Sequence, residues 1–233
     1  KLRRGFDKVI DIWGADHHGY QGRIRALFKA FGEDDKRLDI IFIQLVSLLR
    51  NGEPVSMSTR GGEFVTLKEV VDEVGKDACR FTFMMRRSDA QLDFDLELVK
   101  IQAPENPVYY VQYCHARIMS ILTLAKEKGF ELSDNADESI VERLKESDEI
   151  KLIKKLAAFE EVVEKSAIEM EPHRIAFYLQ ELAAIFHSFY GRNRVVLDDD
   201  KDLTLARMGL SKAVSVVIKN GLAMLGVSAP DKM

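Results

Sequence analysis

The residues best suited to chemistry gather in one polar loop, which covers residues 51–67 and reads N-G-E-P-V-S-M-S-T-R-G-G-E-F-V-T-L. It offers hydroxyls, among them those of Ser58 and Thr59, and the guanidinium of Arg60. Hydroxyls, backbone amides and a guanidinium that lead into a helix N-terminus suit the binding of phosphate oxygens. The alternative is an ordinary hairpin and surface loop, because the stretch opens with the turn signal Asn51-Gly52.

A second polar cluster, G-A-D-H-H-G, follows the apolar run at residues 8–13. Asp16 could accept hydrogen bonds from a ribose or an amine, and His17 or His18 could contact a phosphate or a base. The alternative is that Asp16 caps the following helix while the histidines fill the turn. Zinc is disfavoured, because adjacent histidines lack the i, i+4 spacing of a helical ligand pair.

A third group combines tyrosine with arginine. Tyr109, Tyr113 and Arg117 recur at every fourth position and therefore share one helix face. Rings and a guanidinium in a row could stack unpaired bases, although half-buried packing between helices is the alternative. A further tyrosine, Tyr190, stands beside the basic run G-R-N-R at 191–194.

The elements that must position these groups are of two kinds. An apolar run at 8–13, a helical pattern at 20–31 and a second apolar run at 38–49 predict a strand, a helix and a strand, and hence a parallel sheet. Ligands bind such sheets at the carboxyl ends of the strands, so the first two polar groups could face one crevice.

The rest of the chain is predicted to be helical. Thr66 is expected to cap a helix over 67–74, Asp77 one over 78–85, and Pro107 to open a long helix ending near 128. Further helices are expected over 140–144, 149–165, 172–190 and 203–225, which together form a bundle.

Composition limits the classes of function. The chain has 233 residues, of which 46% are hydrophobic and 31% charged, as in a soluble globular protein, and its net charge of −4 means that any nucleic-acid contact must be local. No apolar run approaches a membrane span. Cys79 and Cys114 lie in apolar helical patterns and are expected to be buried free thiols, in a cytoplasmic protein. The chain begins K-L-R-R, so we expect the back part of a longer protein.

Six segments in order resemble an arginyl-tRNA synthetase, a class I aminoacyl-tRNA synthetase, over essentially the whole chain. They are I-W-G-A-D-H-H-G-Y (12–20), M-S-T-R-G-G-E-F-V-T-L (57–67), D-A-C-R-F (77–81), L-D-F-D-L (92–96), E-N-P-V-Y-Y-V-Q-Y-C-H-A-R-I (105–118) and N-G-L-A-M-L-G-V-S-A-P-D-K-M (220–233).

The resemblance implies a multidomain α/β plus all-α protein. Residues 1–65 would be the end of the catalytic domain, a partial Rossmann-like parallel sheet. Residues 66–104 would be a helical connector, and 105–233 an all-helical anticodon-binding domain. A class I relative such as the cysteinyl enzyme is disfavoured, because metal-ligand cysteines are missing from the sequence.

By the same resemblance, the polar loop occupies the place of the class I signature loop K-M-S-K-R, which stabilises pyrophosphate as the amino acid is adenylated. Both lysine positions are changed, to Ser56 and Thr59, and Arg60 keeps the positive charge. The implied catalytic residues are Ser58, Thr59 and Arg60, and the implied ATP and arginine contacts are Gly14, Asp16, His17 and Met57.

The implied tRNA contacts are Tyr113, Arg117, Tyr190, Arg192, Arg194 and Met233. The expected partners are the tRNA for arginine, arginine, and ATP with Mg2+ as substrate; no tightly bound cofactor or structural metal, no membrane contact and a monomer are expected. The implied activity is ligation of arginine to its tRNA through arginyl-adenylate, with this fragment inactive alone. The alternative is a stand-alone tRNA-binding helical module without catalysis.

Overall fold

The structure is a computed structural model that describes residues 4–55, 65–132 and 138–233. It divides into two compact units, each described by itself. The first consists of Lys1–Ser56 and Arg86–Asp95, and the second of Met57–Met85 and Leu96–Met233.

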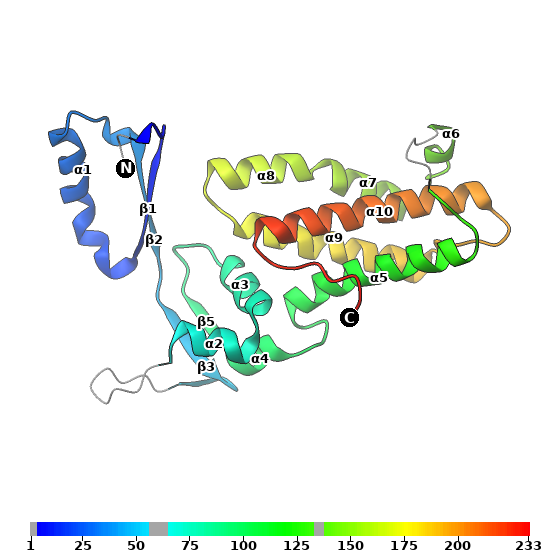
Figure 1. The fold of residues 1–233 in the computed structure, drawn as a ribbon, viewed down its shortest axis with the longest axis horizontal. Helices are drawn as coiled ribbons and strands as arrows, with labels where there is room; N and C mark the ends of the chain where they lie inside the picture. The colour runs from blue at the N-terminus through cyan, green and yellow to red at the C-terminus, as the bar shows by residue number, and fades with distance from the viewer. Residues whose placement is uncertain (1–3, 56–64, 133–137) are drawn as a thin grey trace. The chain divides into compact units, whose positions relative to one another are not determined.

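The first unit contains the predicted strand–helix–strand arrangement. Its first half comprises β1 (Val9–Gly14), a 3-10 helix (Ala15–Tyr20), α1 (Gln21–Ala30), a 3-10 turn (Asp35–Arg37) and β2 (Leu38–Ile43). β1 and β2 pair in parallel from Val9 opposite Leu38 to Gly14 opposite Ile43 (Figure 1). The prediction of a parallel sheet is confirmed.

A second small sheet completes this unit, with strand order β4-β3-β5. Its strands are β3 (Val46–Arg50), β4 (Glu53–Pro54) and β5 (Leu92–Asp95). Asn51 and Gly52 form the predicted hairpin turn with φ of 52° and 80°, the left-handed geometry that favours this residue pair. The Asp95 carboxylate accepts hydrogen bonds from the backbone N–H of both residues, at 3.2 and 2.7 Å.

The prediction of one strand over 38–49 was wrong. β2 ends at Ile43 and β3 begins at Val46, and the two strands belong to different sheets. Between them the backbone N–H of Gln44 donates to the carbonyl of Ser88 at 2.8 Å, which breaks the continuous strand.

The second unit is helical. Its helices are α2 (Leu67–Val74), α3 (Lys76–Met84), α4 (Leu96–Lys100), α5 (Pro107–Glu127), α6 (Glu138–Val141), α7 (Ser147–Ala157), α8 (Phe159–Ile168), α9 (His173–Arg192) and α10 (Lys201–Met224). The three long helices α5, α9 and α10 lie side by side and share one apolar core (Figure 1). The predicted bundle is confirmed.

Local signals set several helix ends. The Thr66 hydroxyl accepts from Glu69 N–H at 3.2 Å while the Glu69 carboxylate accepts from Thr66 N–H at 2.6 Å, so the predicted cap of α2 is confirmed as a capping box. Pro107 opens α5 as predicted. The predicted Asp77 cap was wrong: α3 begins at Lys76, and Asp77 lies inside its first turn. The helix predicted over 149–165 is two helices, α7 and α8.

The bundle core contains one unusually close helix approach. A Cβ at Gly221 of α10 would lie 2.7 Å from Cδ2 of Leu179 on α9, whose side chain is fully buried. Glycine at this position therefore lets α9 and α10 approach more closely than any larger residue would.

Cys79 and Cys114 are buried free thiols, as predicted. Burial raises the pKa of both, most strongly that of Cys114. Among the described residues, no helix combines the length and hydropathy needed to cross a membrane. Within the same ranges, no group of three or more His, Cys, Asp or Glu side chains is arranged to hold a metal.

Candidate functional site

The carboxyl ends of β1 and β2 place the first predicted site residues. Gly14 ends β1, and Asp16 and His17 follow in the 3-10 helix, both largely exposed, with His17 Nε2 3.6 Å from Asp16 Oδ2. A Cβ at Gly14 would lie 2.5 Å from Asp16 Oδ1, so glycine makes room for this carboxylate. The alternative in which Asp16 caps α1 is wrong, because Tyr20 holds the N-cap position and no side chain caps the helix.

A cavity of about 500 Å3 opens at these strand ends, lined by Ala15, His18, Phe42, Gln44 and Asp89. The His18 and Phe42 ring centroids are 4.6 Å apart. His18, and not His17, is therefore the histidine that lines the cavity. The sequence pattern had singled out the histidine pair, but Phe42 lies in an apolar run and carried no separate signal.

The signature-loop residues Met57, Ser58, Thr59 and Arg60 lie outside the described residues. The described chain resumes at residue 65, directly before the capping box that starts α2.

The tyrosine and arginine residues of α5 and α9 form one cluster. The Arg117 guanidinium carbon lies 4.6 Å from the Tyr113 ring centroid and 5.4 Å from that of Tyr190, so the two rings flank the charge. Arg117 also donates to the Tyr113 hydroxyl at 2.8 Å. Tyr109 stacks on Tyr113 with centroids 6.0 Å apart and planes 9° apart. We call Tyr109, Tyr113, Arg117, His187 and Tyr190 the aromatic–arginine cluster.

His187 of α9 belongs to this cluster and was missed from the sequence. Its Nδ1 lies 3.2 Å from the Arg117 Nη1, which can only donate, so Nδ1 accepts and the ring proton sits on Nε2. Burial, followed by the charge of Arg117, lowers the pKa of His187. Its position three residues before Tyr190 on α9 was the available signal.

The end of α9 carries the predicted basic residues. Arg192 is mostly exposed and its guanidinium lies 3.3 Å from the Asp148 carboxylate. Arg194 is exposed, and its carbonyl accepts from Arg207 Nη1 at 2.8 Å. Arg207 also forms a buried ion pair with Glu149, Nε to Oε1 at 2.7 Å. The basic segment at the end of α9 is thus held by a buried ion pair that could not be predicted from the sequence.

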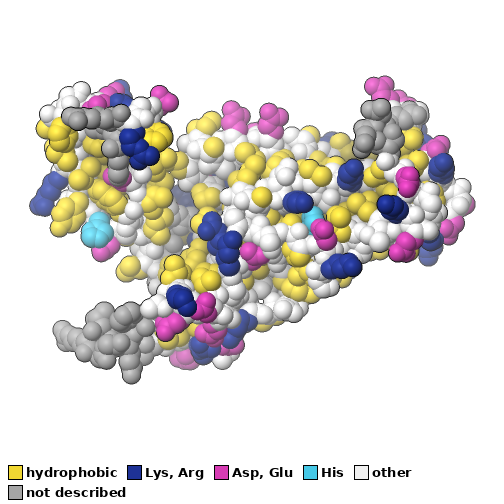
Figure 2. All heavy atoms as spheres, viewed as in Figure 1, with side chains coloured by type: hydrophobic (Ala, Val, Ile, Leu, Met, Phe, Trp, Pro, Cys, Tyr) yellow, Lys and Arg dark blue, Asp and Glu magenta, His cyan; other side chains and the backbone are white. Residues whose placement is uncertain are grey.

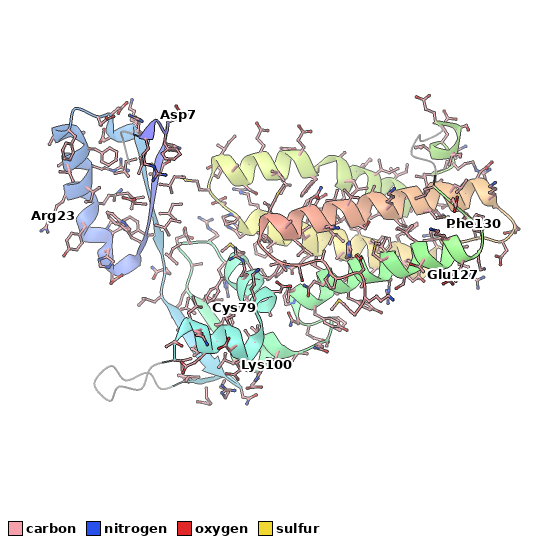
Figure 3. The ribbon with its side chains drawn as sticks, in the orientation of Figure 1. Asp7, Arg23, Cys79, Lys100, Glu127 and Phe130 are labelled. Atoms are coloured by element: carbon pink, nitrogen blue, oxygen red, sulfur yellow. The ribbon has the colours of Figure 1, made fainter. Side chains whose placement is uncertain are left out.

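Met233 lies at a second cavity, of about 660 Å3, which is lined by residues that include Lys100, Asn106, Tyr109 and Gln112. Lys100, at the end of α4 (labelled in Figure 3), binds Glu97 at 2.8 Å and Glu73 at 3.0 Å, and these hydrogen bonds raise its pKa. Met233 is 55% exposed, so its side chain remains available at the rim of the cavity.

Charge is mixed over the face of the helical unit that Figure 2 shows. On the face in Figure 2, the described Lys and Arg side chains of that unit are interspersed with Asp and Glu. A polyanion would therefore be bound through a local set of groups, as the net charge of −4 implied.

The comparisons with known proteins agree on one family. The model of the DALR anticodon binding domain matches residues 111–233. An arginine–tRNA ligase from Citrifermentans bemidjiense is 56% identical over 233 residues, and one from Geobacter sp. is 57% identical over 234. Each alignment covers 100% of this chain but 42% of the relative, so the chain spans about two fifths of these proteins.

Solved structures give the same result. A putative arginyl-tRNA synthetase from Campylobacter jejuni matches with a TM-score of 0.83 and 34% identity, over 100% of this chain and 49% of that one. The Thermus thermophilus arginyl-tRNA synthetase shares the fold, with a TM-score of 0.75 and 24% identity over 97% of this chain and 41% of that one. The chain therefore belongs to the DALR anticodon binding domain family, and its whole length matches the C-terminal part of arginyl-tRNA synthetases.

Proposed function

We propose that this chain is part of an arginine–tRNA ligase, which activates arginine with ATP and transfers it to the 3′ end of its tRNA. Relatives of that name align with the whole chain at 56–57% identity. We assign residues 1–65 to the end of a Rossmann-like catalytic domain, 66–104 to a connector and 105–233 to anticodon binding. A monomeric, cytoplasmic enzyme is part of the same proposal.

The observation that carries tRNA binding is the aromatic–arginine cluster, which lies within the matched anticodon-binding segment and its immediate neighbourhood. Tyr190 is partly exposed, so its ring offers a stacking surface for an unpaired base. Arg117 is already engaged by Tyr113 and His187, which favours a role in orienting these rings over direct phosphate binding. Arg192 and Arg194 are the exposed cations for phosphates.

Gly14, Asp16 and His17 are assigned to ATP and arginine, and the cavity beside them supplies an aromatic wall through Phe42. The loop residues Met57, Ser58, Thr59 and Arg60 are assigned to ATP by family resemblance. Arg60 and the two hydroxyls would stabilise charge developing on the departing pyrophosphate, while Mg2+ accompanies ATP as part of the substrate.

The chain alone is expected to be catalytically silent, because it covers 42% of the ligases that it matches. A stand-alone tRNA-binding module is the second candidate, favoured by the size of the helical unit. ATP–pyrophosphate exchange by the isolated chain tests its expected inactivity and does not separate the two candidates: activity would contradict the proposal that the fragment is inactive, whereas its absence agrees with either candidate.

The central test is a tRNA titration over a salt series with the full-length ligase that contains this chain. Each phosphate contact contributes about −0.9 to the slope of log K against log salt for a duplex and about −0.7 for a single strand. Arg194→Gln should make this slope shallower by about one contact. The control is Lys165→Gln on α8, whose ammonium pairs with Glu161. Failure of the wild-type ligase to bind tRNA at low salt would refute the proposal.

A further inference from the structure

The chain does not leave the bundle when α10 ends at Met224. Residues 225–233, which we call the C-terminal segment, turn back over α3 and α5 (Figure 1). Terminal residues are commonly disordered unless specific contacts hold them. Here polar groups from two different helices hold the segment at three successive places.

The first contact lies at the end of α10. Arg80 of α3 donates from Nε to the carbonyl of Leu225 at 3.0 Å, which places a cation at the helix C-terminus. The next residue, Gly226, has a φ of +70°, and a Cβ there would lie 2.6 Å from Arg80 Nε. Glycine is therefore required both by the left-handed turn and by the guanidinium beside it.

The second contact is a network around Asp77. Its Oδ2 accepts from the backbone N–H of Ser228 at 3.1 Å, from the Ser228 hydroxyl, and from Gln112 Nε2 at 3.1 Å. Gln112 Nε2 also donates to the Ser228 carbonyl at 3.0 Å. Both backbone polar groups of Ser228 are thus bound by side chains of α3 and α5, which fixes the residue on two sides.

The third contact is made by His115 of α5, whose ring is almost completely buried. Its Nδ1 lies 3.1 Å from the carbonyl oxygen of Pro230. A carbonyl can only accept, so Nδ1 carries the proton in this bond. The Asp231 carboxylate lies 3.8 Å from the same nitrogen.

These contacts end two residues before Met233, which lines the 660 Å3 cavity together with Tyr109. Tyr109 in turn stacks on Tyr113 of the aromatic–arginine cluster. A held segment presents Met233 beside Tyr109 before any ligand arrives, so the entropy of ordering it is not lost on binding.

We propose that Asp77, Gln112 and His115 are positioning residues for RNA binding: they fix the C-terminal segment so that Met233 and Tyr109 together meet one unpaired base. Asp77 and Gln112 also line the cavity at Met233, whereas His115 does not, and the role assigned to all three is to hold the segment. This inference rests on the proposed function, and it takes Met233 as a contact of the tRNA, as the family resemblance implies.

The test uses the full-length ligase and the isosteric variant Asp77→Asn. The matched control is Asp72→Asn on α2, where the carboxylate forms an exposed pair with Lys68. Hydrogen exchange of the peptide covering 226–233 should accelerate at least about tenfold in Asp77→Asn and stay unchanged in Asp72→Asn. If Asp77→Asn folds poorly, Ser228→Ala replaces it in the test, because this variant leaves every helix residue intact. It should accelerate exchange of the same peptide, but more weakly.

The functional readout is a double-mutant cycle on tRNA affinity with Asp77→Asn and Met233→Ala. Each single variant should lower the affinity for tRNA by about threefold to thirtyfold. The double variant should have about the same affinity as the single variant with the lower affinity. A purely structural role of Asp77 would not produce this non-additivity.

Three results would overturn the inference. They are unchanged exchange of the 226–233 peptide in Asp77→Asn, additive losses of affinity in the cycle, or full affinity in Met233→Ala. Each of these can occur in a ligase that binds tRNA. Absence of tRNA binding by the wild-type ligase is a different outcome and refutes the proposed function itself.

Discussion

Two neighbouring acidic residues of α7 provide a sharp test of how burial sets the strength of an ion pair. Glu149 is fully buried and pairs with Arg207, whose side chain is 8% exposed, at 2.7 Å. Asp148 pairs with Arg192, whose side chain is 69% exposed, at 3.3 Å. The perturbations are Glu149→Gln and Asp148→Asn, which remove one charge each and keep the side-chain shape.

The expected magnitudes differ severalfold. Removing one partner of a buried pair leaves a charge without its counter-ion and costs about 3–5 kcal/mol. Loss of an exposed pair costs about 0–1 kcal/mol. At about 2–4 °C per kcal/mol, Glu149→Gln should lower Tm by about 6–20 °C, and Asp148→Asn by at most about 4 °C.

The assay is thermal unfolding of both variants, followed by far-ultraviolet circular dichroism, which reports on the helices. Equal midpoints for the two variants would refute the reasoning. Replacing both buried partners, as in Glu149→Met with Arg207→Met, should restore part of the loss, because no charge is then left buried. A double variant less stable than each of the single variants Glu149→Met and Arg207→Met would contradict this explanation.

Gly221→Ala should destabilise the bundle by about 1–3 kcal/mol because its methyl group enters the α9–α10 contact. The control is Gly209→Ala in the same helix, where the added Cβ would have no neighbour within 4 Å, and it should stabilise the bundle by up to about 1 kcal/mol. If urea unfolding found Gly221→Ala more stable than Gly209→Ala, the close approach of α9 and α10 would be contradicted. The lowered pKa of His187 means that the folded state favours neutral imidazole, so stability is complete above the ordinary value of 6.5 and falls as the pH drops below it. His187→Asn should flatten that part of the pH profile. An unchanged slope would show that His187 does not cause this pH dependence of stability. Arg60→Ala in the full-length ligase should slow ATP–pyrophosphate exchange by about tenfold to a thousandfold, or about 1.4–4 kcal/mol, and unchanged exchange would refute its assignment.

Features with a short-range cause were predictable from the sequence. The Asn51-Gly52 turn, the Thr66 cap and the Pro107 helix start each depend on neighbouring residues, and all three were confirmed. The six family segments likewise led to the synthetase resemblance, which the comparisons confirm.

Features decided by distant residues were not predictable. Residues 38–49 read as one strand because the partner that interrupts it, Ser88, lies far along the chain. Asp77 read as a helix cap because Ser228, which its carboxylate binds, is 151 residues away. The Glu149–Arg207 pair looked like two ordinary charged helix positions for the same reason: burial is a property of the assembled bundle.

The contact between Asp77 and Ser228 also constrains the order of events during synthesis on the ribosome. At about 5–20 residues per second, the 151 residues between them take about 8–30 s to be made. Throughout that interval Asp77 and Arg80 of α3 lack the partners that the C-terminal segment supplies, whereas α2, α4 and α5, which also contact α3, are completed before or early in it. The docking of the C-terminal segment on α3 is therefore a late step in folding, because its residues are the last to be made.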